Sequence, residues 1–420
     1  MTNLNEPDNV YATESRKNLP IIIIGILGLF TIASVGMLHT NEKEFIEVFL
    51  PLASNFQISL YDTVLYISYL IFGIITGVIS DRLGKRKVFI LVGSAGSALF
   101  SWLLTISPSF ASLLVFRFLQ GTFTVLVWQI FMTLVLDVSS PTTRGKNMGI
   151  FGTFLAISMG LSPLVGGFLA DVGVFMPYYV AVGFSGAVLI LSIFLIKEPE
   201  NISKRPSLKQ NFSAAVNNSK LIIPASYNFI DRFHMGFILF ALPLLILDVL
   251  DLGPSMRGIA LAIFGLPFIL LQYPFGKLSD KYGRYIFLIT GSIGYGIVLS
   301  LVGFLGSISF AYLVSALVFL GILSGITNPA NMALVADYVK KEDRAMGMGF
   351  YNFAGNLGIV LGPVIGGILL INSSYVVAFI WMGVIEFLGV LINTLLLRFM
   401  FKQKKVFSRT EYVTFIGSDE

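Results

Sequence analysis

Ionisable side chains interrupt stretches of this sequence that are otherwise apolar. In "NFIDRFH", the residues Asn228, Asp231, Arg232 and His234 break a long hydrophobic run. Charges in hydrocarbon are costly, so they usually mark ion pathways, proton relays or ligand sites. On a helix Asp231 and His234 share one face, while Arg232 is turned about 100° away. The group predicts either a proton or substrate site facing a cavity, or an Asp–Arg pair that is neutralised for structural reasons.

A second polar group is "HTNEKEFIE", where His39, Glu42, Lys43 and Glu47 follow a spacing of three to four residues. On a helix they would form one stripe. One interpretation is an external acidic loop after a short first helix. The favoured interpretation is that this helix continues through the polar residues to about residue 52. Histidine and carboxylates buried together there would exchange protons near neutral pH.

Other polar residues also lie inside apolar segments. Arg117 and Gln120 lie in "RFLQG", where the arginine either serves a buried site or reaches the membrane interface with its long side chain. In "TNPAN", Asn328 and Asn331 flank Pro329, which suits a cavity wall or a simple helix kink. Glu386 is expected at the periphery, where contact with lipid or a partner is as good an explanation as function.

The elements that must hold these residues are membrane-spanning helices. The 420 residues are 55% hydrophobic and only 12% charged, against about 25% charged in soluble domains. About 20 apolar residues cross a bilayer as a helix, and continuous apolar runs argue against a β-barrel. Twelve segments meet this test: 20–53, 57–80, 88–107, 110–138, 147–170, 175–196, 221–248, 257–279, 285–306, 309–338, 346–371 and 374–399. The sequence predicts an all-α polytopic membrane protein.

Several kinds of chemistry are excluded. The chain has no cysteine, so it has no disulfides or thiolate metal sites. It also lacks the motifs of nucleotide-driven or hydrolytic enzymes. We therefore expect no enzymatic activity, no bound metal and no cofactor other than a gradient of protons or another ion.

The basic residues indicate topology. With the N-terminus in the cytoplasm, all 28 Lys and Arg residues except Lys43, Arg117, Arg232 and Arg257 fall in the tails or in cytoplasmic loops. This is the positive-inside pattern, which here accounts for the net charge of +5 without a nucleic-acid partner. We expect a monomer in the plasma membrane with both termini cytoplasmic, whose partners are the lipid bilayer and a small-molecule substrate.

The chain repeats itself. "GVISDRLGKRK" from Gly77 is echoed by "GKLSDKYGRYI" from Gly276, an offset of 199 residues, and Asp137 and Asp337 are 200 apart. Upstream, Ala33 and Ala225 suggest an offset of 192, which would pair His39 with Asp231. The predicted organisation is an N-terminal tail (1–19), a six-helix bundle (20–196), a cytoplasmic linker (197–220), a second six-helix bundle (221–399) and a C-terminal tail (400–420).

The first of these charged motifs resembles the signature G-x-L-x-D-R-x-G-R-K of the major facilitator superfamily. The resemblance implies two pseudo-symmetric halves that open alternately to each side, with helices 1, 4, 7 and 10 around a central cavity. It also implies that "RFLQG" is tied to proton coupling. The motifs after helices 2 and 8 would form a gating latch, with Arg144 and Arg344 as partners of the aspartates. The predicted latch comprises Gly77, Asp81, Arg82, Gly84, Arg86, Arg144, Gly276, Asp280, Gly283, Arg284 and Arg344.

A glycine motif bears on the direction of transport. "GIVLGPVIGG" resembles a sequence typical of helix 5 in drug–proton antiporters, but here it lies in helix 11; helix 5 has Ser158 and Ser162 instead of two glycines. The motif comprises Gly358, Gly362, Pro363, Gly366 and Gly367, with Pro163, Gly166 and Gly167 in helix 5. Close helix packing explains it equally well. Proton-coupled efflux is favoured; import of an organic anion or other metabolite by a symporter or facilitator, and a receptor or scaffold that does not transport, remain alternatives.

Overall fold

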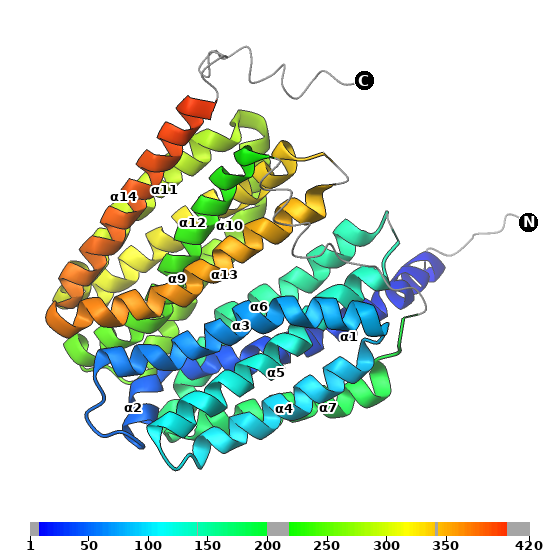
Figure 1. Ribbon diagram of the computed structural model, residues 1–420, viewed down its shortest axis with the longest axis horizontal. Helices are drawn as coiled ribbons and strands as arrows, with labels where there is room; N and C mark the ends of the chain where they lie inside the picture. The colour runs from blue at the N-terminus through cyan, green and yellow to red at the C-terminus, as the bar shows by residue number, and fades with distance from the viewer. Residues whose placement is uncertain (1–7, 141, 200–217, 341–342, 401–420) are drawn as a thin grey trace, which may run out of the picture. The chain divides into compact units, whose positions relative to one another are not determined.

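The computed structural model describes residues 8–140, 142–199, 218–340 and 343–400, and these residues are helical without any strand (Figure 1). Among the described residues, twelve helical segments are long and apolar enough to cross a membrane. The predicted all-α membrane class is therefore confirmed. The elements are α1 (Asp8–Gly36), η1 (Met37–Thr40), α2 (Glu42–Glu47), α3 (Asn55–Leu83), α4 (Lys87–Thr105), α5 (Phe110–Asp137), α6 (Arg144–Val172), α7 (Met176–Leu195), η2 (Ser219–Leu221), α9 (Ile222–Leu250), α10 (Pro254–Tyr282), α11 (Arg284–Ile308), α12 (Phe310–Tyr338), α13 (Arg344–Asn372) and α14 (Tyr375–Met400).

The chain forms two compact units. The first comprises residues 1–39 and 67–205, and the second comprises residues 40–66 and 206–420. Within each unit the helices pack pairwise: α1 on α6 and α4 on α5 in the first, and α9 on α13 and α11 on α12 and α14 in the second. Residues 40–66 group with the second unit, whereas the sequence boundary lies in the linker. Most of that linker, and the predicted C-terminal tail beyond residue 400, fall outside the described residues.

The first membrane helix ends earlier than we expected. α1 stops at Gly36, a 3₁₀ turn covers Met37–Thr40, and the six-residue helix α2 follows. A Cβ on Gly36 would collide with the Ser162 side chain, and one on Gly166 would collide with the Met37 backbone, so α6 lies against the chain where α1 ends. Thr40 and Asn41 are also weak helix formers. The favoured continuous helix to residue 52 is wrong.

The repeat register is also corrected. Ser158 donates a hydrogen bond to the Leu29 carbonyl at 2.7 Å, and a Cβ on its repeat mate Gly358 would meet the Phe229 carbonyl. These contacts are related by 200 residues, not 192. Gly36 against Ser162 and Gly236 against Gly362 obey the same relation. Asp231 is therefore equivalent to Thr31 and not to His39.

The glycine motif of α13 serves close helix packing. Added Cβ atoms at Gly358 and Gly362 would meet backbone atoms of α9, and one at Gly366 would meet the Phe237 ring. Gly367 faces Ser59 in the same way. Helices without side chains at the contact can approach to backbone distance. The packing interpretation is thus supported by geometry, while a role in the direction of transport stays a prediction.

Candidate functional site

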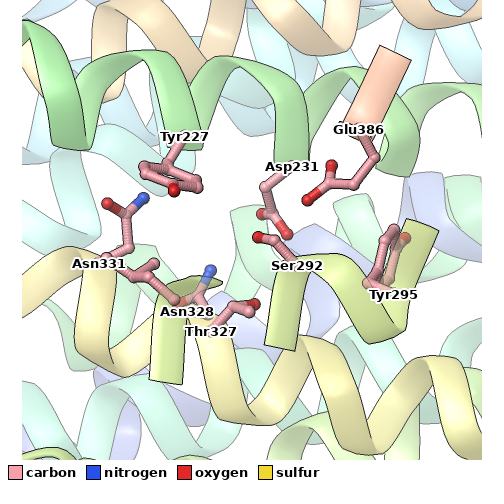
Figure 2. A pocket seen from close by; sticks show the side chains of 9 residues that line it. Tyr227, Asp231, Ser292, Tyr295, Thr327, Asn328, Asn331 and Glu386 are labelled. Carbon is pink, nitrogen blue, oxygen red and sulfur yellow. The ribbon is translucent and has the colours of Figure 1, made fainter. Parts of the chain in front are cut away.

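A small cavity lies inside the second unit, between α9, α11, α12 and α14 (Figure 2). Its volume is about 20 Å³. The lining residues are Tyr227, Asp231, Leu288, Ser292, Tyr295, Thr327, Asn328, Asn331 and Glu386. A buried water needs at least about 10–15 Å³, whereas pockets for drug-sized ligands run to several hundred. The cavity can hold a water molecule or a small ion, but no organic solute.

Two carboxyl groups point into this cavity from different helices. Asp231 on α9 is partly exposed, whereas Glu386 on α14 is only 6% exposed. Nδ1 of His234 lies 3.2 Å from Oε2 of Glu386, and its ring stacks on Tyr295. Arg232 interacts electrostatically with Asp231. Two carboxyl groups and one guanidinium group therefore meet at this site.

Two buried polar atoms on the cavity wall have no hydrogen-bond partner within the described part of the chain. They are the hydroxyl oxygen of Tyr227 and Oδ1 of Asn331, on side chains that are 5% and 4% exposed. The Nδ2 of Asn331 is used, because it donates to the Pro224 carbonyl at 3.2 Å. Leaving buried polar atoms unsatisfied costs free energy, so such atoms call for an explanation such as an ion or water.

The first unit shows that this polarity is not required by the fold. In the 200-residue register, Tyr227, Thr327 and Asn331 correspond to Leu27, Val127 and Phe131. The latter three belong to one buried hydrophobic cluster. At these three positions the same helix arrangement therefore carries apolar side chains in one unit and polar side chains in the other. Packing of the helices alone does not require the polar set.

Most site residues predicted on helices 7 and 10 come together here. Asp231, Asn328 and Asn331 line the cavity. His234 does not line it but contacts Glu386, which does. Asn228 does not line it; its Nδ2 donates to the Tyr351 carbonyl at 2.8 Å and ties α9 to α13.

Glu386 and Tyr295 were missed by sequence reasoning. The signal at Glu386 was a lone carboxylate in a long apolar run, which we discounted because helix 12 is peripheral in the family. Its burial rules out the expected exposure to lipid.

In the first unit Arg117 is fully buried, which excludes the interpretation that it reaches the interface. Its Nη1 donates to Oε1 of Gln120 at 2.8 Å, and Nε2 of Gln120 donates to Oγ of Ser101 at 2.8 Å. The predicted pair is therefore joined in one network between α5 and α4. Its link to proton coupling stays a prediction.

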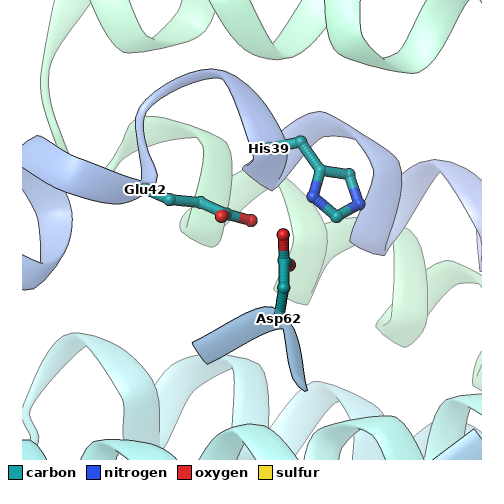
Figure 3. A group of neighbouring side chains, drawn as sticks. All are labelled: His39, Glu42 and Asp62. Carbon is teal, nitrogen blue, oxygen red and sulfur yellow. The ribbon is translucent and has the colours of Figure 1, made fainter. Parts of the chain in front are cut away.

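Part of the polar stretch that follows α1 is buried and does not form an exposed loop. His39 and Glu42 are 6% and 5% exposed. Their ligand atoms and those of the buried Asp62 lie within 4.8 Å of one another (Figure 3). The single stripe predicted for this stretch does not form, because Glu47 is only half-buried and lies beyond the break in the helix. Asp62, a carboxylate within the apolar helix α3, was not singled out from the sequence.

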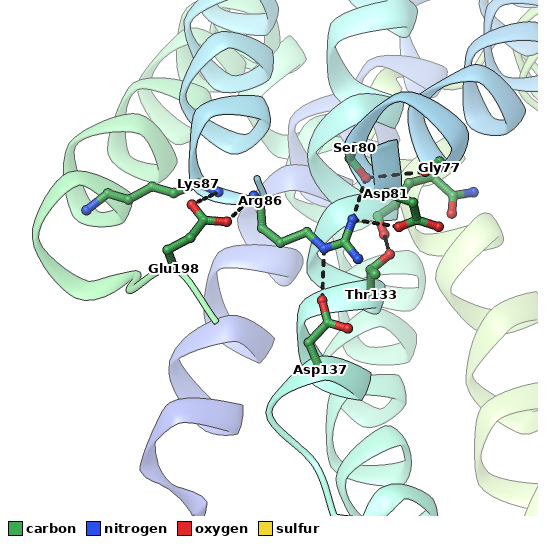
Figure 4. A network of polar contacts seen from close by, with 9 residues as sticks. Gly77, Ser80, Asp81, Arg86, Lys87, Thr133, Asp137 and Glu198 are labelled. Carbon is green, nitrogen blue, oxygen red and sulfur yellow. Dashed lines mark hydrogen bonds and ion pairs between the residues drawn. The ribbon is translucent and has the colours of Figure 1, made fainter. Parts of the chain in front are cut away.

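The first charged motif forms a closed network around Arg86 (Figure 4). This side chain is fully buried. It donates to Oγ of Ser80 at 2.6 Å, to Oδ1 of Asp81 at 2.7 Å and to Oδ2 of Asp137 at 2.8 Å. Gly84 has φ 61°, which a glycine adopts without strain and which supports the predicted tight turn. Arg82 is exposed and outside the network.

The start of α4, next to Arg86, is capped by Glu198. Its carboxylate accepts hydrogen bonds from the backbone N–H groups of Arg86 and Lys87. A carboxylate at a helix N-terminus satisfies unpaired donors and complements the helix dipole.

The second motif repeats this network in a more exposed form. Arg284 donates to Oγ of Ser279 at 2.9 Å and to Oδ2 of Asp337 at 3.2 Å, and it pairs with Asp280. The Asp280 and Asp337 side chains are 62% and 48% exposed. Gly283 has φ 97°, as the predicted turn requires. Gly276 makes only an ordinary contact with Pro329.

The latch partners named from the sequence need correction. We expected Arg144 and Arg344 to pair with Asp81 and Asp280. Both arginines are exposed, at the starts of α6 and α13, and the ion pairs to the aspartates come from Arg86 and Arg284. The loop that follows each aspartate brings its own arginine back to the helix end, a geometry that residue spacing did not reveal.

Arg257 and Lys43, two of the four basic residues that lie outside the predicted cytoplasmic segments, anchor α2 within the second unit. Arg257, 2% exposed, donates to the Thr40 carbonyl at 2.7 Å and binds the Glu44 carboxylate with both terminal nitrogens. Lys43 pairs with Asp248 at 2.7 Å, and Asp248 also accepts a hydrogen bond from Tyr375 at 2.6 Å.

We expect Arg257→Met to lower the free energy of unfolding by about 1.5–3 kcal/mol, because it removes bidentate, charge-assisted hydrogen bonds. Lys43→Met is the matched control and should cost about 0–1 kcal/mol, since Asp248 keeps its bond to Tyr375 and the pair is half-exposed. Denaturant titration of purified protein measures both values. Equal losses in the two variants would show that Arg257 does not anchor α2.

Twelve apolar helices, two repeated packing patterns and buried ionisable residues define a polytopic membrane transporter built from two related halves. The chain belongs to the Major Facilitator Superfamily, whose family model matches residues 18–229 and 224–412. It is therefore a multi-pass membrane transporter for small molecules and not an enzyme.

Among its relatives, the bacillibactin exporter of Bacillus subtilis is 26% identical over 83% of this chain and 91% of that protein. The quinolone resistance protein NorA of Staphylococcus aureus is 26% identical over 70% of this chain and 75% of that protein. The solved structure of the nucleoside transporter NupG superposes with a TM-score of 0.73, at 12% identity, over 92% of this chain and all of that one, and shows the same fold.

Proposed function

We propose that this protein is a secondary transporter that exports a small organic solute from the cell in exchange for protons, by alternating access. The observation that carries the proposal is the set of ionisable residues Asp231, His234 and Glu386, which lie together among membrane helices, with His234 and Glu386 buried. Ionisable groups inside a membrane protein are typical of proton and ion pathways. Two relatives whose names describe export or drug resistance support the outward direction.

The proposed setting is the plasma membrane, with both termini in the cytoplasm. The concentration of Lys and Arg in the tails and in alternate loops supports this orientation. No bound cofactor is needed, because an ion gradient supplies the driving force.

Transport into proteoliposomes tests the coupling. Vesicles containing the purified protein are loaded at pH 6 and diluted into pH 8 with a fluorescent quinolone, a catechol siderophore or a nucleoside outside. Antiport predicts that solute accumulates inside as protons leave, whatever the orientation of the protein. Accumulation only with the opposite gradient would instead indicate symport, and would contradict the efflux proposal.

Asp231→Asn should abolish gradient-driven accumulation, because an amide cannot carry the proton. We expect at least a tenfold loss of initial rate, with unchanged elution in size-exclusion chromatography. Asp171→Asn, which alters an exposed carboxylate of the first unit, is the control and should transport normally. Normal gradient-driven transport by Asp231→Asn would show that this carboxylate is structural.

A further inference from the structure

The cavity inside the second unit has the size, charge and chemistry of a site for one small cation. The polar side-chain atoms of its lining residues are oxygens, which can coordinate a cation, apart from the amide nitrogens of Asn328 and Asn331. Hard cations prefer carboxylate, amide carbonyl and hydroxyl oxygens. We propose that this cavity binds a single Na⁺ ion. The inference goes beyond the proposed function, which names protons alone as the driving ion, and Na⁺ binding itself does not rest on that function.

The unsatisfied atoms point to a ligand independently of the acidic residues. The Tyr227 hydroxyl and Oδ1 of Asn331 belong to side chains at least nine-tenths buried, and both line the cavity (Figure 2). Each can offer a lone pair to a cation. Both residues line the same cavity as Asp231 and Glu386, and this space admits an ion but not an organic solute.

Charge balance selects a monovalent ion. The titratable and charged groups at the site are Asp231, Arg232 and His234 from α9, Tyr295 from α11, Tyr351 from α13 and Glu386 from α14, together with Tyr227. Asp231 and Glu386 supply two carboxyl groups, and Arg232 supplies one guanidinium group. A monovalent cation suits this set better than a divalent ion, which would leave a buried positive charge at a high cost in free energy.

The backbone also makes room for the second carboxylate. A Cβ on Gly296 of α11 would lie 3.2 Å from Cγ of Glu386 and 3.0 Å from the Phe387 ring. The glycine therefore lets α14 bring Glu386 up to the cavity. In the first unit, Leu27, Val127 and Phe131 fill the equivalent space with hydrocarbon, so no such site exists at those positions.

Thermal unfolding of the purified full-length protein tests the proposal without any solute. NaCl is titrated against choline chloride at constant ionic strength and at pH 8. A ligand that binds only the folded state raises the unfolding midpoint. We expect Na⁺, but not choline, to raise it by a few degrees.

Two near-isosteric variants locate the site. Asp231→Asn and Glu386→Gln should each abolish the Na⁺ effect while keeping the wild-type elution volume, and Asp171→Asn should retain it. If either variant fails to fold, Asn331→Leu is the alternative test. It removes one neutral ligand but no carboxylate, and it should weaken Na⁺ binding at least several-fold.

The proposal is overturned if Na⁺ acts no differently from choline on the wild type, or if its effect survives in both carboxylate variants. Failure here combined with accumulation driven by a pH gradient would leave the proposed function intact and reject only the sodium site. Sodium binding without gradient-driven transport would support the sodium site and reject the proposed function.

Discussion

Arg86→Ala is expected to lower the free energy of unfolding by roughly 3–5 kcal/mol, because removing one partner of a buried ion pair leaves an uncompensated charge. Both the Arg86 and Asp137 side chains are 0% exposed, and Asp81 also depends on this guanidinium. Denaturant unfolding in a defined detergent measures the loss.

The chain contains its own control for that experiment. Arg284 holds the equivalent serine and two aspartates, but the Asp280 and Asp337 side chains are largely in solvent. Arg284→Ala should therefore cost only about 0–1 kcal/mol. Pairing Arg86→Ala with Asp137→Asn should recover part of the loss, because the stranded carboxylate is gone. Equal costs for the two arginines would contradict the assignment of Arg86 as the buried member.

Gly362→Ala should separate α9 from α13. The new methyl group would meet backbone atoms of Phe233, Gly236 and Phe237, which cannot move aside as a side chain can. Overpacking of this kind lowers the free energy of unfolding by roughly 1–3 kcal/mol. The transport rate should also fall, because α9 carries Asp231.

Gly152→Ala is the matched control, since nothing lies within 4 Å of the added methyl group. An alanine in the middle of α6 should be neutral or stabilising by up to about 1 kcal/mol. The comparison uses unfolding midpoints and proteoliposome transport side by side. If Gly362→Ala were as harmless as Gly152→Ala, the close approach of α9 and α13 would not matter for stability or function.

The sequence predicted the helices well because hydrocarbon thickness imposes a length on every span. It also predicted the turns at Gly84 and Gly283, where a positive φ is needed. It failed where a contact depends on a distant element. At the break after Gly36 the chain lies against Ser162 and Gly166 of α6, a contact that the sequence around Gly36 does not reveal.

The site was predicted only in part for the same reason. Asp231 and Asn331 were found because charge and amides are unusual in apolar helices. Glu386 is likewise a charged residue in an apolar helix. It is buried against Gly296 of α11, however, and this contact cannot be read from the sequence. The false register that paired His39 with Asp231 rested on short sequence matches, and only the packing of α1 and α9 against their partners revealed it.

The apolar cluster of the first unit offers a template for engineering. Tyr227→Leu, Thr327→Val and Asn331→Phe would copy into the second half the side chains that Leu27, Val127 and Phe131 already place together elsewhere in the same molecule. These changes leave Asp231 and Glu386 in place. The resulting protein would therefore separate what the neutral polar groups contribute from what the carboxylates contribute.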